Sequence, residues 1–85
     1  MTEIEREIRS EIAKAVRELG GSAELVATIE GKTKEEMYDA AERLGADRYL
    51  LAAIGSWRGT LTDKQVLADL REWNAGGAAE KTSPG

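Results

Sequence analysis

Carboxylates, hydroxyls and lysines are the side chains of this sequence that could do chemistry, because its 85 residues contain no His and no Cys. This composition excludes Cys or His metal sites, disulfides and nucleophiles activated by an imidazole. Two acidic pairs, Glu35 with Asp39 and Asp69 with Glu72, each lie on one helix face, where they could share a proton or bind a hard cation. Such pairs are more often only solvated, and no glycine-rich phosphate loop or carboxylate loop accompanies them. We therefore expect no enzyme activity, no cofactor and no metal.

The segment over residues 55–60 is the first candidate for a binding site. It is rich in small residues and places Trp57 next to Arg58, and both residue types are enriched at interface hot spots. We expect both side chains to contact a partner protein. The alternative is that Trp57 folds back over one end of the core, as a Trp in a small domain usually does. The core residues concerned would be Ile54, Leu61 and Trp73.

Acidity is concentrated in one part of the chain. The formal net charge is −4, and residues 34–42 contain four acids and one base. These acids could meet a basic surface of a partner and compete for a groove that binds nucleic acid. They are Glu35, Glu36, Asp39 and Glu42.

Five helices must position these residues. Three starts have a Thr followed three residues later by Glu or Gln, the pattern of a reciprocal capping box. The boxes are Thr2 with Glu5, Thr33 with Glu36, and Thr62 with Gln65. Helical periods of apolar residues, and glycines at the ends, give the extent of each helix. The predicted helices cover residues 3–19, 23–30, 34–44, 48–55 and 63–73.

The sequence predicts an all-α fold: one long N-terminal helix followed by two hairpins, each of a short and a long helix, in a compact bundle. At this length we expect a single domain over residues 1–75 and a disordered tail over residues 76–85. The longest apolar run, residues 49–54, is far shorter than the roughly 20 residues that span a bilayer. The first twenty residues lack the pattern of a signal peptide. We therefore expect no membrane contact and a cytoplasmic location.

Two features leave alternatives open. The apolar stripe of the helix over residues 3–19 could form one wall of the core or pair with the same helix of a second copy. Residues 22–41 can be laid on a helix-turn-helix template, with Ala27, Gly31 and Met37 at its characteristic positions. Carboxylates on the would-be recognition helix argue against DNA, and the bases elsewhere form no stripe. Those bases are Arg43, Arg48, Arg58, Lys64 and Arg71.

The C-terminal part of the chain carries a resemblance to known proteins. Residues 54–74 contain I-G-S-W, then T-L, then V-L-A-D-L-R-E-W-N. This segment, about a quarter of the chain, resembles one in short uncharacterised bacterial and phage proteins, where I-G-S-aromatic leads through T-L to V-L-x-x-L-R-x-aromatic-N. The resemblance implies a small all-helical accessory protein and supplies no catalytic residue.

These observations favour a non-enzymatic module that binds and occupies a partner protein. A small inhibitor from a phage or mobile element, such as an anti-CRISPR protein, is its most concrete form. One alternative is a helix-turn-helix DNA-binding regulator that dimerises through its first helix. The other is a homo-oligomeric structural unit.

Overall fold

The computed structural model describes residues 2–57 and 59–77, and these residues form an all-helical fold. No strand occurs among them, which confirms the predicted fold class. The elements are α1 (Glu3–Glu18), α2 (Ala23–Thr28), the 3₁₀ turn η1 (Ile29–Gly31), α3 (Lys34–Arg43), α4 (Arg48–Ser56), α5 (Asp63–Glu72) and the π-type turn η2 (Trp73–Gly77). Residues 78–85, most of the predicted tail, lie outside the described part of the chain.

A side chain caps the start of every α-helix by accepting the backbone N–H three residues later. The caps are Thr2, Ser22, Thr33, Asp47 and Thr62. Only Thr33 takes part in a complete capping box, because Glu36 accepts the Thr33 backbone N–H in return. In the other two predicted boxes the Thr hydroxyl caps the helix, but no return bond forms from the side chain three residues later to the backbone N–H of the Thr. The amide of Gln65, for example, donates to Asp69 Oδ1 at 3.0 Å instead of pointing back to the cap.

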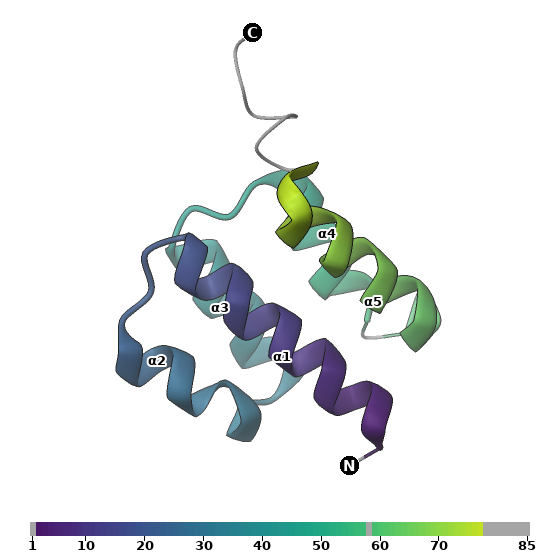
Figure 1. Ribbon diagram of the computed structural model, residues 1–85, viewed down its shortest axis with the longest axis horizontal. Coiled ribbons are helices and arrows are strands. Elements are labelled where there is room, and N and C mark those ends of the chain that lie inside the picture. Colours follow the sequence, from purple (N-terminus) through teal and green to yellow (C-terminus); the bar gives the residue numbers. More distant parts are fainter. Residues whose placement is uncertain (1, 58, 78–85) are drawn as a thin grey trace, which may run out of the picture.

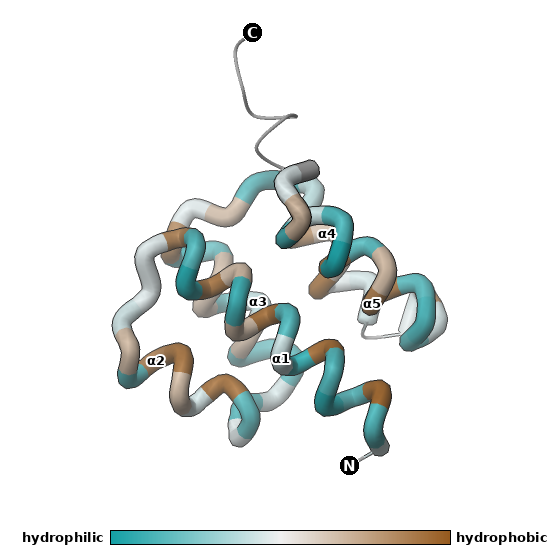
Figure 2. The backbone as a smooth tube through the Cα atoms, viewed as in Figure 1, coloured by the Kyte–Doolittle hydropathy of each residue, from teal (hydrophilic) through white to brown (hydrophobic). Residues whose placement is uncertain are grey.

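The helices form two layers. Figure 1 shows α1 between α2 and α5 in the front layer, with α3 and α4 behind them. In Figure 2 the tube of α1 alternates between brown and teal along its length, as an amphipathic helix requires. Its apolar side is fully buried at Ile8, Ile12, Ala15 and Val16. The stripe is therefore a wall of the core, and that side of α1 is not available to a second copy.

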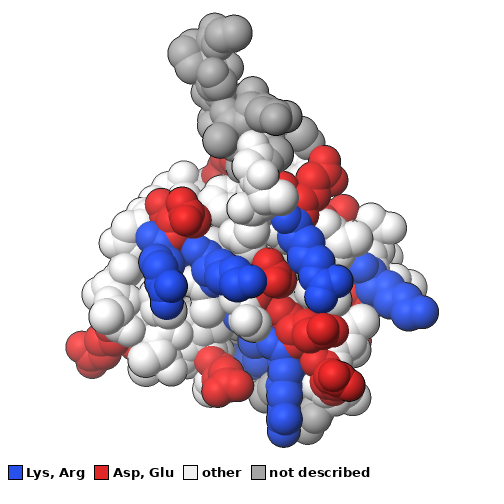
Figure 3. Space-filling view, in the orientation of Figure 1, with Lys and Arg blue, Asp and Glu red and all other residues white. Residues whose placement is uncertain are grey.

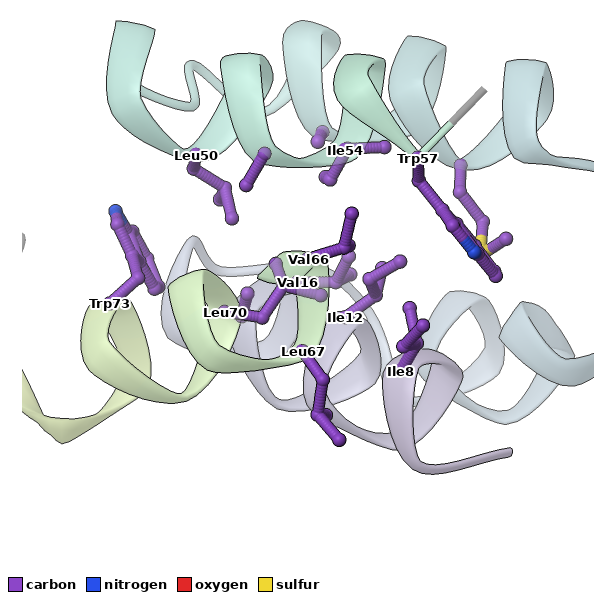
Figure 4. Close-up of a cluster of buried hydrophobic side chains, with 14 of the residues drawn as sticks. Ile8, Ile12, Val16, Leu50, Ile54, Trp57, Val66, Leu67, Leu70 and Trp73 are labelled. Carbon is purple, nitrogen blue, oxygen red and sulfur yellow. The ribbon is translucent and has the colours of Figure 1, made fainter. Parts of the chain in front are cut away.

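The core fills the space between the two layers. Figure 4 shows Leu50 and Ile54 from α4 facing Val66 and Leu70 from α5 across it. The other fully or nearly fully buried apolar residues include Ile29, Met37, Ala41 and Ala53. No polar or charged residue is buried among the described residues. The core is thus held by apolar packing, and the charged side chains of the described residues lie at or near the surface.

The two expected hairpins differ in their packing. α4 packs against both α3 and α5, whereas α2 packs mainly on α1 and buries none of its six residues completely. α2 also ends two residues earlier than predicted, because the chain tightens into the 3₁₀ turn η1. α2 therefore lies at the periphery of the fold, whereas α4 is held between α3 and α5.

Candidate functional site

Trp57 is not exposed to solvent, although the interpretation of residues 55–60 as a binding site required it to be. α4 extends through Ser56, and Trp57 at its end is 2% exposed. The prediction of Trp57 as an exposed contact residue is therefore wrong. Trp57 is instead part of the core, as the alternative predicted, together with Ile54 and Trp73. Figure 4 places Trp57 and Trp73 at opposite ends of that core, and Leu61 is 38% exposed, so the end that Trp57 covers is not the one formed by Leu61 and Trp73. Arg58 lies outside the described residues.

Two cations hold the Trp57 ring in place. The ammonium of Lys34 lies 4.7 Å from the ring centroid and the guanidinium of Arg9 lies 5.5 Å from it, both within range of a cation–π contact. Lys34 Nζ also donates to the Trp57 carbonyl at 3.2 Å. Trp57 Nε1 has no acceptor among the described residues, so ring contacts and apolar packing fix this side chain. Lys34 is thereby drawn inward, away from the exposed acids of α3.

All four predicted acids of α3 are exposed, but they do not have one role. Glu36 Oε1 accepts the backbone N–H of Thr33 at 2.8 Å. This bond, followed by the bond with the Thr33 hydroxyl, lowers the pKa of Glu36 below its ordinary value of 4.5. Glu36 therefore stabilises the start of α3. The remaining three acids form what we call the acidic stripe: Glu35, Asp39 and Glu42.

The acidic stripe follows one side of α3. Its members are spaced i, i+4 and i+7, so they lie within about 60° of each other around the helix and span about 10.5 Å of its length. None of the three forms an ion pair with another described residue. The ion pairs of the described chain, Lys14 with Glu11 and Arg71 with Glu7, lie within α1 and between α1 and α5. The stripe is consequently a negative ridge on the back layer; Lys32 and Arg43 lie near it only on the side of Asp39.

A shallow groove of about 560 Å³ lies beside this ridge on the outer side of α4. We call it the α4 groove. Small or apolar side chains make most of its wall, and Arg48 is the one charged residue among the described residues that line it. It is lined by Tyr38, Arg48, Leu51, Ala52, Gly55, Ser56 and Thr60. Gly55, Ser56 and Thr60 of the groove belong to the candidate segment over residues 55–60. Its other α4 residues, Arg48, Leu51 and Ala52, are not predicted to form a site, although six consecutive apolar residues, 49–54, are more than the single buried side of a surface helix needs.

A second groove, of about 350 Å³, lies on the other side of the acidic stripe. Lys32 and Arg43 face Glu36 and Asp39 there, so both signs of charge line it. Leu25 and Leu44 are its large apolar residues. The two bases and two acids offset each other, so this groove carries no net charge from these four side chains.

The helix-turn-helix interpretation is not supported by the packing. In that template the residue at the position of Ala27 packs tightly between the two helices, but Ala27 is exposed. α2 packs on α1, whereas the partner that α3 contacts most extensively is α4. Figure 3 shows Lys and Arg interspersed with Asp and Glu over the face formed by α1, α2 and α5.

Within residues 2–57 and 59–77, no three acidic side chains gather into a potential metal site. No helix in the same described part is long and apolar enough to cross a membrane. No protein-family model matches the chain, and neither a curated protein nor a solved structure shows significant similarity to it.

Proposed function

We propose that this chain is a non-enzymatic protein-binding module, and that its contact surface is the α4 groove together with the acidic stripe. The observation that carries the proposal is the position of α4. This helix is apolar throughout residues 49–54. Leu50, Ala53 and Ile54 are buried in the core and Tyr49 and Leu51 are half-buried against it, whereas Ala52 is exposed in the groove. Helices that are apolar all round are normally buried all round, so the exposed Ala52, with half-buried Leu51 and Gly55 beside it, suits contact with a partner protein.

The composition of this surface fits an interface better than a reaction site. The groove is shallow and offers no pair of groups arranged for proton transfer or nucleophilic attack. Small side chains at Ala52 and Gly55 allow a partner to approach the backbone of α4 closely. The ridge of Glu35 and Glu42 along its edge adds a charge that selects for a basic partner and against an acidic one.

A small inhibitor, including an anti-CRISPR-like protein, is the narrower form of this proposal. Imitation of a nucleic acid by acids alone is the less favoured mechanism, because the acidic stripe offers three carboxylates. Proteins that bind DNA tightly make about 6 to 10 phosphate contacts. An inhibitor of this size would therefore act by holding an apolar part of its target in the α4 groove, with the acids fixing its orientation.

The test is recovery of a partner from the source cell by a tagged protein and two matched variants. Ala52→Arg places a long charged side chain in the α4 groove, and Ala68→Arg places the same side chain on the solvent side of α5. Both alanines are exposed and helical, and Arg has nearly the helix propensity of Ala, so neither change should disturb the fold. We expect mass spectrometry to find a protein bound to the wild type and to Ala68→Arg that is absent from Ala52→Arg. Equal recovery by both variants would remove the α4 groove as the contact surface.

A further inference from the structure

Building on the proposed function above, we propose that the α4 groove binds an amphipathic helical segment of the partner. The inner side of that segment is apolar, and Lys or Arg residues seven positions apart follow the edge that faces α3. Three properties of the back layer lead to this occupant: its size, the side chains along α4, and the spacing of the charges on α3.

The size of the surface favours a single helix over a globular face. At 1.5 Å per residue the ten residues of α3 and the nine of α4 are about 15 and 14 Å long, and each helix is about 10 Å wide. Together they present an area on the order of 300 Å², whereas a standard interface uses about 800 Å² on each partner. A helix of about ten residues has the length of this surface and can lie along it.

The side chains along α4 favour close helix packing. Ala52 and Gly55 lie one turn apart on the outer side of α4, and Leu51 and Tyr38 border them. Small residues at a helix contact bring the two axes toward the short end of the usual 8 to 10 Å. A partner helix can therefore insert a Leu or Met side chain between the borders of the groove.

The charges fix the edge and the direction of the partner helix. Glu35 and Glu42 are seven residues apart, which is close to two turns, so they flank Tyr38 on the same side of α3. Bases at positions i and i+7 of a helix lying alongside would meet both carboxylates. Arg48 lies on the α4 side of the groove and favours an acid on the opposite edge of the partner. The occupant is thus basic along one edge only.

A second copy of this chain does not satisfy these requirements. In a symmetric dimer the same surface patch is used twice, so the acidic stripes of the two copies would lie across one interface. Like charges placed opposite each other across an interface disfavour association. The area of the surface is also well below what a stable dimer uses.

The test uses two designed peptides and the isotope-labelled full chain. Each peptide has about 14 residues, an Ala- and Leu-rich inner side and blocked ends; one carries Lys at positions i and i+7 of one edge, and the other carries Glu there. The double variant Glu35→Lys/Glu42→Lys reverses the charge of the groove edge. Its control, Glu3→Lys/Glu18→Lys, changes one acid near the start and one near the end of α1 by the same total charge.

We expect the Lys peptide to shift the amide resonances of Tyr38, Ala52 and Gly55, and to bind about three- to tenfold more tightly than the Glu peptide at low salt. In the groove-edge variant this preference should vanish or reverse, and in the α1 control it should persist. Equal affinity of the two peptides, an equal loss in both variants, shifts confined to other surfaces, or no binding in the millimolar range would overturn the proposal. If Ala52→Arg still abolishes recovery of the cellular partner, the α4 groove remains a binding surface and only the basic helix is excluded as its occupant.

Discussion

Asp47 joins the start of α4 to the end of α5, and one substitution removes both contacts. Its Oδ1 accepts the backbone N–H of Leu50 at 2.8 Å and so caps α4. Trp73 Nε1 donates to both carboxylate oxygens, at 3.1 Å to Oδ2 and 3.3 Å to Oδ1. Because α4 carries the proposed binding surface, this carboxylate helps to set the position of that surface. We predict that Asp47→Ala lowers the free energy of unfolding by more than the loss of an ordinary cap.

The magnitude follows from the two contacts. Loss of an N-cap costs about 1 kcal/mol. Trp73 is 9% exposed, so its indole N–H would be left without an acceptor in a largely dry position, at about 1 to 3 kcal/mol. The sum is about 2 to 4 kcal/mol for Asp47→Ala. The control Thr62→Ala removes only the cap of α5 and should cost about 1 kcal/mol.

Urea unfolding of the wild type, the two single variants and a cycle with Trp73→Phe measures this difference. If the reasoning is correct, Asp47→Ala and Trp73→Phe are coupled by about 1 kcal/mol, because each removes the same hydrogen bond. The dependence on urea should not change, since the surface exposed on unfolding stays the same. Equal costs for Asp47→Ala and Thr62→Ala, together with additive effects in the cycle, would refute the second role of Asp47.

Three further predictions follow from particular side chains. In a Trp73→Phe variant the remaining Trp57 should resist quenching by acrylamide, because its ring is buried. Glu36→Gln should lower the free energy of unfolding at neutral pH, and this difference from the wild type should disappear in acid. The pKa of the Glu36 carboxyl in the folded state lies below 4.5. The carboxylate's contribution to stability is therefore present above pH 4.5 and is lost as pH falls through the folded pKa. Gly21→Ala should cost about 1 to 3 kcal/mol, because a Cβ there would lie 2.5 Å from Val16 Cγ1 and 2.9 Å from the Val16 carbonyl oxygen.

Each of these has an outcome that contradicts it. Efficient quenching of Trp57 would place its ring in solvent. If Glu36→Gln destabilises the fold as much at pH 3 as at pH 7, the cost of the substitution does not come from the charge of the capping carboxylate. For Gly21 the comparison is Gly31→Ala, where an added Cβ meets nothing within 4 Å and should be close to neutral. Equal effects of the two Ala substitutions would argue against a clash with Val16.

The helix starts could be predicted from the sequence because caps act locally. All five α-helices begin at the predicted residue, each directly after a Ser, Thr or Asp that accepts a backbone N–H. Glycines after α1 and α3 could be predicted as terminators for the same reason. Gly20 and Gly45 have φ values of 90° and 86°, a conformation that disfavours other residues.

The prediction of an exposed Trp57 is wrong because it takes Gly55 as the end of the fourth helix. Gly55 lies inside α4 and has no positive φ, and the left-handed glycine of this region is Gly59. The spacing of Leu50, Ile54 and Trp57, which is i, i+4 and i+7, contained the correct answer, since it continues the buried side of α4 through Trp57.

The α4 groove could not be predicted from local patterns. Residues 49–54 are apolar throughout, so the sequence alone does not say which side of α4 faces the core. That side is decided by where α3 and α5 pack, which depends on contacts between residues far apart in the chain. The acids of α3 could be identified, but the separate role of Glu36 in the capping box became distinct only in three dimensions.

The most direct test of the central claim is the affinity of the recovered partner for Ala52→Arg compared with Ala68→Arg. A charged side chain in the middle of the contact should weaken binding by at least about tenfold, or about 1.4 kcal/mol, and the same side chain on α5 should leave the dissociation constant unchanged. If Ala52→Arg binds the partner as tightly as Ala68→Arg, with both folded by circular dichroism, the outer side of α4 is not the binding surface of this protein.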